Sequence, residues 1–174
     1  LAALDLKLRH AMQDELRRIH EQIGGTFVFV THDQSEALSL ANRIAVMNEG
    51  EIVQEGNAEE IYLEPKSMFV SNFIGETNAI STNLFDSSSL DQNNSTIIIR
   101  PEAIKISIKE TNTDVELEGI VREVVFLGSQ VKYKVSVQEN ILNVSKTSDN
   151  YDRQIKKEST VKVGWDLKNQ IFIN

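Results

Sequence analysis

Five consecutive β-branched and aromatic residues, Thr26 to Val30, constrain the fold of this chain more than any other stretch. An uninterrupted run of this kind predicts a strand buried on both faces, as in the parallel sheets of α/β proteins. Directly after the run, Asp33 and Glu36 have the spacing of an N-cap and its capping box, which predicts that a helix begins there.

His32 lies between the predicted strand and the predicted helix. In open α/β sheets this turn is at the carboxyl edge, where ligands bind, and a nearby helix N-terminus favours phosphate-like anions. The alternative is a surface histidine that only supports the turn. The local pattern leaves both interpretations open.

An amphipathic helix is predicted before the strand, with Asp5 as its N-cap and Gly24 and Gly25 at its end. Its apolar face repeats at three- and four-residue intervals and consists of Leu8, Met12, Leu16, Ile19 and Ile23. The other face carries charges, and His10 and His20 are expected there, exposed to solvent. Helix, strand and second helix follow one another as in doubly wound α/β folds.

A hairpin and two short helices are predicted next. The strands of the hairpin are Arg43 to Met47 and Glu51 to Gln54, and its turn is Asn48-Glu49-Gly50. Gly56 and Asn57 precede a short helix that runs through Tyr62 and stops before Pro65, and a second amphipathic piece covers Ser67 to Phe73.

The composition changes around residues 75–78, and from there to Asn94 the chain is rich in Ser, Asn, Asp and Thr, which predicts a domain boundary with weak edge strands. The remainder is predicted to be a small β barrel or sandwich, with Gly128 in one hairpin turn. Its expected strands are 96–99, 105–108, 115–126, 131–137, 141–145, 159–163 and 170–173.

The charge balance narrows the possible functions. With 26 acidic and 18 basic residues, the net charge of −8 provides no basic surface for a nucleic-acid backbone. The chain has no cysteine, which excludes disulfides and thiolate chemistry, and its three histidines are too scattered to indicate a metal site. No apolar run approaches the roughly 20 residues that cross a bilayer.

Two groups in the β region could carry chemistry. Four glutamates, Glu102, Glu116, Glu118 and Glu123, could pair as acid and base, although solvent-facing strand positions are the simpler interpretation. Trp165, Tyr133 and Tyr151 could form a stacking platform for a nucleic acid or a sugar, as small OB-like barrels do. The acidic balance favours ordinary packing for these rings.

The ordered set of motifs resembles the distal part of an ABC transporter ATPase. It comprises Leu4-Asp5, Thr31-His32-Asp33-Gln34 with Glu36-Ala37, Arg43 to Met47, and Gly50 to Gly56. Residues 61–65 and 69–78 extend the resemblance to importer ATPases with a C-terminal regulatory domain, most similar to those of spermidine/putrescine importers. Arg100-Pro101-Glu102 and residues 119–128 resemble the OB-like TOBE domain of that family.

The resemblance implies roles for four residues. His32 matches the switch-loop histidine, which contacts the γ-phosphate of ATP and helps to place the attacking water. Ala3, Leu4 and Asp5 match the D-loop, which couples two ATP sites across a dimer; Asp5 as a mere helix cap is the alternative. Ala2 stands where the family often has serine, which puts one hydroxyl contact of that loop in doubt.

The resemblance also implies the fold, with an α/β portion of a P-loop ABC ATPase domain over 1–78 and an all-β OB-like TOBE domain over 79–174. ATP and Mg²⁺ are expected in the intact protein, at the cytoplasmic face of the membrane. The implied partners are permease subunits, a second ATPase subunit in a homodimer and, indirectly, a solute-binding protein. Nucleic acid is not expected as a partner.

The sequence contains no Gly-x-x-x-x-Gly-Lys-[Ser/Thr] phosphate loop, and it begins with leucine in the middle of an apparent motif. We therefore expect a fragment of a longer enzyme, without bound cofactor or ATPase activity by itself. The alternative function is a non-catalytic dimerisation or ligand-sensing module that acts through the β domain.

Overall fold

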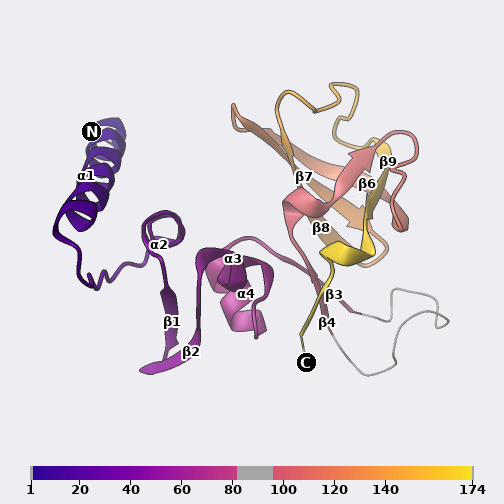
Figure 1. Ribbon diagram of the computed structural model, residues 1–174. Helices are drawn as coiled ribbons and strands as arrows, with labels where there is room; N and C mark the ends of the chain where they lie inside the picture. Colours follow the sequence, from indigo (N-terminus) through magenta and orange to yellow (C-terminus); the bar gives the residue numbers. More distant parts are fainter. Residues whose placement is uncertain (1, 82–95, 174) are drawn as a thin grey trace. The chain divides into compact units, whose positions relative to one another are not determined.

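The computed structural model describes residues 2–81 and 96–173, which form two compact units, Leu1–Gly75 and Glu76–Asn174. The first unit is helical with one hairpin, and the second is almost entirely β-structure (Figure 1). Most of the polar connection expected over 79–94 lies outside the described residues. No helix in the described ranges has both the length and the apolar character that crossing a bilayer requires.

Helix α1 spans Ala2–Ile23 and ends as predicted, because Gly24 takes a φ of +65° and donates its N–H to the carbonyl of His20 at 2.9 Å. The prediction of Asp5 as N-cap is wrong, since the helix already includes Ala2, Ala3 and Leu4. Alanine and leucine are strong helix formers and extend the helix past the expected cap.

The apolar face expected to pack is instead exposed at four of its five positions, with Ile19 half-buried. The exposed members are Leu8, Met12, Leu16 and Ile23.

The strand predicted over Thr26 to Val30 is not formed. This segment is extended but pairs with no strand in residues 2–81 or 96–173, and Val28 and Val30 are 88% and 90% exposed. A central strand exists only where neighbouring strands accept and donate its backbone hydrogen bonds. The pattern was that of a buried strand, but the described residues provide no neighbours for it.

The hairpin predicted after the second helix is confirmed. Helix α2 spans Gln34–Leu40, strand β1 Ile44–Asn48 and strand β2 Glu51–Gly56. The strands pair antiparallel from Ile44 opposite Gly56 to Asn48 opposite Glu51. Glu49 and Gly50 both take positive φ, at 51° and 86°, which is the geometry that a two-residue turn between twisted strands requires.

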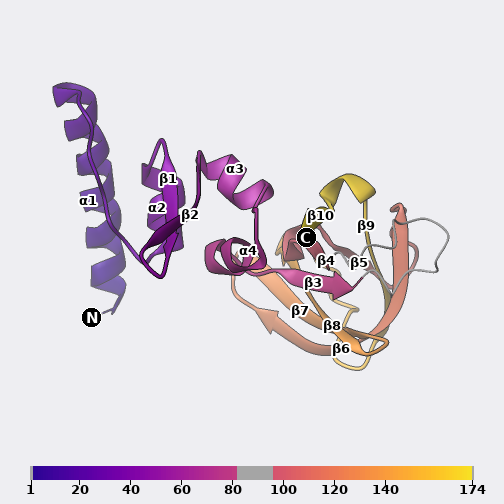
Figure 2. The same cartoon turned by 90° about the horizontal axis from the view of Figure 1, so that it is seen from below.

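Two short helices complete the first unit (Figure 2). Asn57 caps α3, Ala58–Leu63, through a complete capping box with Glu60, and Ser67 caps α4, Met68–Ile74. Both helices agree with the prediction to within one or two residues. They cover the hairpin and bury a small cluster of Ile44, Val46, Ile61, Val70 and Ile74.

The second unit contains two antiparallel sheets. The smaller sheet has the strand order β10-β4-β3, formed by Ile171–Ile173, Thr96–Ile99 and Asn78–Ser81. The larger sheet has the order β5-β9-β6-β7-β8. Its strands are Lys105–Ser107, Thr160–Trp165, Val115–Phe126, Gln130–Val137 and Asn140–Thr147.

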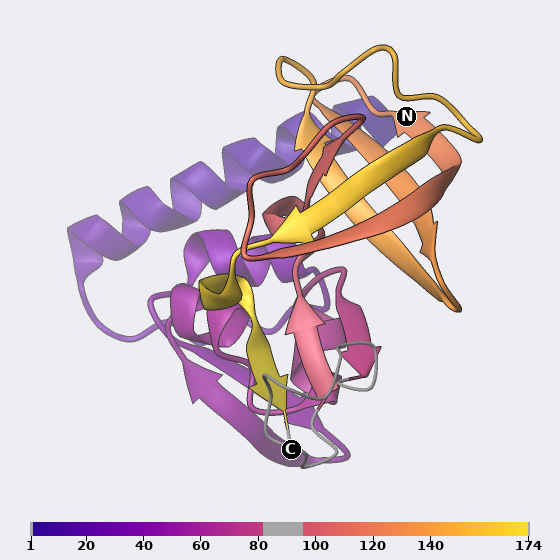
Figure 3. The same ribbon diagram turned by 90° about the vertical axis from the view of Figure 1, so that its right-hand side faces the viewer.

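The larger sheet curls so that its edge strands approach each other (Figure 3). Lys146 of β8 donates to the carbonyl of Ile106 in β5 at 3.3 Å. The side chain of Asn78 then bonds β8 of the larger sheet, donating to the Asn143 carbonyl at 2.8 Å and accepting from its N–H at 2.7 Å. This OB-like barrel confirms the predicted fold of the C-terminal region, with strand boundaries within about three residues of those expected.

Alternation along the strands builds the barrel core. In β7, Val131, Tyr133, Val135 and Val137 are buried and the residues between them face outward. Short 3₁₀ helices at Pro101–Ala103 and Leu167–Asn169 link the two sheets. Gly128 turns the β6–β7 hairpin at a φ of +85°, as predicted.

Candidate functional site

The turn around His32 is ordered by the start of α2. Asp33 takes an extended conformation and its carboxylate accepts from the N–H groups of Ser35 and Glu36, at 2.9 and 3.3 Å. The hydroxyl of Ser35 donates to the same oxygen of Asp33 at 2.6 Å. The helix start predicted at Asp33 is therefore confirmed, and two of the free N–H groups at the helix terminus are bonded.

A second set of bonds involves Thr31, a member of the sequence motif to which no role was assigned. Its hydroxyl accepts from the backbone N–H of Asp33 at 3.0 Å and donates to the carboxylate of Glu36 at 2.6 Å. The expected capping box linked Glu36 to Asp33 directly, whereas here the Thr31 hydroxyl bridges the two. A threonine two residues before an N-cap can form such a turn, and this was the available signal.

His32 itself is exposed, while its neighbours Thr31 and Asp33 are half-buried. Within residues 2–81 and 96–173 its imidazole makes no hydrogen bond. An imidazole N–H is suited to donate to a phosphate oxygen.

His32 lines an open cleft of about 970 Å³ within the first unit. Its walls come from the C-terminal half of α1, the extended segment 25–34, and strand β1. Arg17 of α1 donates to the carbonyl of Ser39 in α2 at 2.8 Å, and the ring of Phe27 packs edge-on against His20 with centroids 5.3 Å apart. His20, expected to be exposed, is therefore half-buried, and the cleft is lined mainly by apolar residues, with Arg17 and Arg43 among its polar ones.

The D-loop assigned to the start of α1 stays a prediction. Ala3, Leu4 and Asp5 lie in the first turn of α1, and their side chains lie outside what the structure describes.

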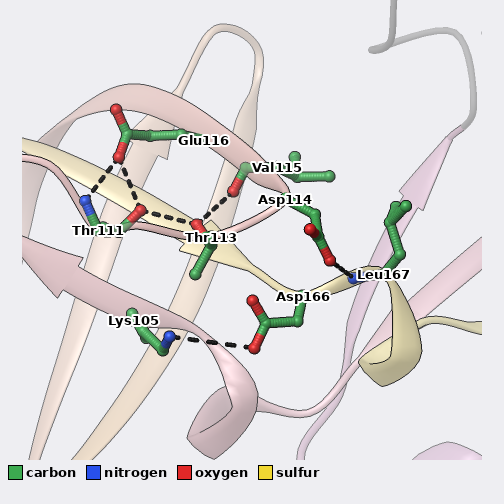
Figure 4. Close-up of polar contacts among 8 residues, drawn as sticks. All are labelled: Lys105, Thr111, Thr113, Asp114, Val115, Glu116, Asp166 and Leu167. Carbon is green, nitrogen blue, oxygen red and sulfur yellow. Dashed lines mark hydrogen bonds and ion pairs between the residues drawn. The ribbon is translucent and has the colours of Figure 1, made fainter.

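The glutamates of the β region do not form an acid and base pair. Glu118 pairs with Lys162 at 3.4 Å and Glu123 with Lys134 at 2.7 Å, while Glu102 is exposed. Glu116 accepts from the N–H and the hydroxyl of Thr111, at 2.6 and 2.7 Å (Figure 4). These two hydrogen bonds, the backbone one first, lower the pKa of Glu116. The solvent-facing interpretation of these positions is confirmed.

The aromatic residues do not form a binding platform. Trp165 and Tyr133 lie in the barrel core, with 0% and 1% of their surface exposed, and Tyr151 packs beside the core against Phe126. Their faces are therefore not available to a base or a sugar. In the described part of the chain, no group of three metal-ligating side chains lies close enough together to hold a metal ion.

Comparison with known proteins gives a family for the chain and a domain for its C-terminal region. Residues 97–172 match the TOBE domain family. A spermidine/putrescine import ATP-binding protein PotA from Thermotoga maritima is 36% identical over 201 residues, covering 99% of this chain and 55% of its own length. The chain belongs to this family of import ATP-binding proteins.

Other relatives with the same name support the assignment. PotA of Acidothermus cellulolyticus is 43% identical over 82% of this chain and 43% of its own length, and PotA of Bacillus thuringiensis is 35% identical over 100% and 51%. The chain therefore spans about half the length of the relatives that it matches. The resemblance inferred from the motifs is confirmed, and it extends over the whole chain.

A solved structure of the cytoplasmic molybdate-binding protein ModG is also similar, at 10% identity and a TM-score of 0.41, over 45% of this chain and 60% of its own. A similarity this weak carries no further argument.

Proposed function

We propose that this chain is the C-terminal part of the ATP-hydrolysing subunit of an ABC importer for polyamines such as spermidine and putrescine. The observation that carries the proposal is the identity of 35 to 36% to import ATP-binding proteins over essentially the whole chain. In this proposal, residues 1–78 belong to the ATPase domain and 79–174 to the TOBE domain. The subunit lies at the cytoplasmic face of the membrane.

His32 is the residue to which we assign the chemistry. Its imidazole contacts the terminal phosphate of ATP and helps to orient the attacking water, which is an electrostatic and positioning role. The exposed ring on a hydrogen-bonded turn fits a phosphate oxygen, and this is the part of the nucleotide site that the described residues can supply. ATP supplies the phosphoryl group and Mg²⁺ balances its charge; the phosphate loop and the Mg²⁺ ligands belong elsewhere in the intact subunit.

The remaining partners follow from the same proposal. Ala3, Leu4 and Asp5 act as the D-loop, which couples the two ATP sites of a homodimer. Permease subunits in the membrane respond to the movement of the ATPase subunits, and a solute-binding protein delivers the polyamine.

The test is His32→Ala in the intact subunit, assembled with its permease. We expect ATP turnover to fall about 100-fold or more, since positioned groups of this kind contribute that much, with nucleotide affinity largely retained. Steady-state hydrolysis and equilibrium binding of a fluorescent ATP analogue measure the two effects. His20→Gln is the control, because it changes a second histidine of the same cleft that has no proposed role. Unchanged turnover in His32→Ala refutes the assignment.

The transported solute needs its own experiment. The assembled importer, reconstituted in vesicles, should take up labelled spermidine in an ATP-dependent manner, and a non-polyamine cation of similar size should not compete. If the other cation competes as well as unlabelled spermidine does, the importer is not specific for polyamines and this part of the proposal fails.

A second candidate is a dimerisation or ligand-sensing module that acts through the TOBE domain without catalysis. The observation in its favour is that the second unit has a barrel core built from its own residues. Analytical ultracentrifugation of residues 76–174 tests dimerisation, and a strictly monomeric species would argue against that form of the candidate.

A further inference from the structure

We propose that Thr31 and Glu36 are positioning residues for His32, acting through the hydrogen bond between the Thr31 hydroxyl and the Glu36 carboxylate. The inference rests on the role proposed above for His32 and adds two residues to it. Neither residue touches the nucleotide in this proposal. Both act by holding the backbone on the two sides of the histidine.

The geometry places the bonds on either side of His32. Upstream, the Thr31 hydroxyl donates to Glu36 in the first turn of α2 at 2.6 Å. Downstream, the N–H of Asp33 donates to the same hydroxyl at 3.0 Å. The residues before and after His32 are therefore tied to each other and to α2, while the imidazole remains exposed.

Helix capping does not account for the bond. The carboxylate of Asp33 already accepts from the N–H groups of Ser35 and Glu36, and it also bonds the Ser35 hydroxyl. The hydroxyl of Thr31 connects the helix to the chain that precedes it, which capping does not require. It thus determines where the incoming chain meets α2.

The Thr31 bonds hold the turn through residues close to it in the sequence. Thr26 to Val30 form no ladder with any strand of the described ranges, and Val28 and Val30 are almost fully exposed. The hydroxyl of Thr31 fixes the entry to the turn through its two local hydrogen bonds. A catalytic group must be held within a fraction of an ångström of its productive position, so losing this link should reduce turnover more than it reduces binding.

The decisive experiment compares four variants of the intact, assembled subunit: Thr31→Val, Thr31→Ser, His32→Ala and the double variant Thr31→Val/His32→Ala. We expect Thr31→Val to reduce turnover about tenfold while the KM for ATP changes less than about twofold, because valine has the same shape but no hydroxyl. Thr31→Ser restores the hydroxyl and should restore most of the turnover. The double variant should be no slower than His32→Ala alone.

Two further variants keep the test independent of folding. Glu36→Gln retains the size of the acceptor but replaces a charged partner with a weaker neutral one, and should lower turnover by about threefold. Ser39→Ala is the matched control, because it removes a nearby hydroxyl, within α2, that donates to the carbonyl of Glu36 at 3.3 Å. It should leave turnover unchanged. Thermal unfolding of each variant identifies any loss caused by instability.

The outcomes separate the two proposals. If His32→Ala retains full turnover, the proposed function fails whatever Thr31 does. If His32→Ala is inactive but Thr31→Val and Glu36→Gln are normal, the positioning role fails and the assignment of His32 stands. A double variant slower than His32→Ala by the full effect of Thr31→Val would also overturn the positioning role, because Thr31 would then act independently of the histidine.

Discussion

The two units differ in how completely they bury their apolar side chains and pair their backbone hydrogen-bonding groups. Among the described residues, the second unit buries sixteen apolar side chains in one cluster, which includes the fully buried Trp165 and Tyr133, and pairs its strands in two sheets. The first unit buries five, and the sequence run that looked most like a core strand is exposed. The same kind of apolar sequence therefore has different outcomes, depending on whether pairing partners are present in the described residues.

This difference shows what an apolar pattern means. In β7, Val131, Tyr133 and Val135 each have a paired strand on both sides, and the side chains of the strand alternate between buried and outward-facing. In the segment from Thr26 to Val30, the pattern is equally strong but no described strand pairs with it. Burial requires both the pattern and a neighbouring surface.

The largest expected effect concerns the core of the second unit. Trp165→Ala should lower the free energy of unfolding by about 4 kcal/mol, because it removes a completely buried indole and leaves a cavity. Urea denaturation followed by circular dichroism measures the change. Phe172→Ala, at an exposed ring, is the matched control and should cost much less. Equal costs would contradict a barrel core centred on Trp165.

Gly164→Ala tests how closely the loop before β6 packs on β9. A Cβ at this position would overlap the Thr113 hydroxyl and lie 2.5 Å from both the Thr111 hydroxyl and the Val115 carbonyl. We expect the free energy of unfolding, measured by thermal denaturation, to fall by about 2 kcal/mol, because these atoms belong to a hydrogen-bonded loop that must shift. Gly128→Asn, at an open position with positive φ, should be tolerated. A tolerated Gly164→Ala would show that the loop is loosely held.

A matched pair of substitutions tests the contrast within the first unit. Val46→Thr puts a hydroxyl into the small core and should cost about 1 to 2 kcal/mol, whereas Val28→Thr, on the exposed segment, should change stability by less than about 0.5 kcal/mol. Urea denaturation of this chain compares the two. If Val28→Thr lowers the free energy of unfolding as much as Val46→Thr does, the segment around Val28 is buried in solution and does not differ from the small core.

The smallest expected effect is a dependence of stability on pH. The hydrogen bonds from Thr111 lower the pKa of Glu116 in the folded chain below its ordinary value of 4.5. The stability they contribute is therefore present above pH 4.5 and is lost as the pH falls through the lowered pKa. Glu116→Gln should remove this part of the acid sensitivity. Unfolding midpoints measured from neutral to acidic pH check it.

Thr111→Val is the companion variant for the pH experiment. It removes the hydroxyl but keeps the backbone N–H that makes the larger contribution, so it should remove only part of the same dependence. If the unfolding midpoint of both variants depends on pH as in the unmodified chain, Glu116 is not the source of the acid sensitivity.

Much of the fold could be predicted because its determinants are local. The hairpin turn at Glu49-Gly50, the cap at Asn57 and the alternation of β7 each depend on residues close together in the sequence. The helix start at Asp33, and with it the location of His32 in a turn, was predictable for the same reason. The Thr31 bridge was missed because a hydroxyl can bond several nearby groups and the sequence does not show which one.

The sequence by itself determined the family, the order of the elements and the turn that carries His32, since motifs and caps act over a few residues. The tertiary structure decided which of the apolar patterns lead to burial and which carboxylates find cations. It placed Trp165 in a core, paired Glu118 with Lys162 and Glu123 with Lys134, and left Val28 and Val30 exposed. Burial and ion pairing depend on surfaces brought together from distant parts of the chain, and a local pattern does not specify these surfaces.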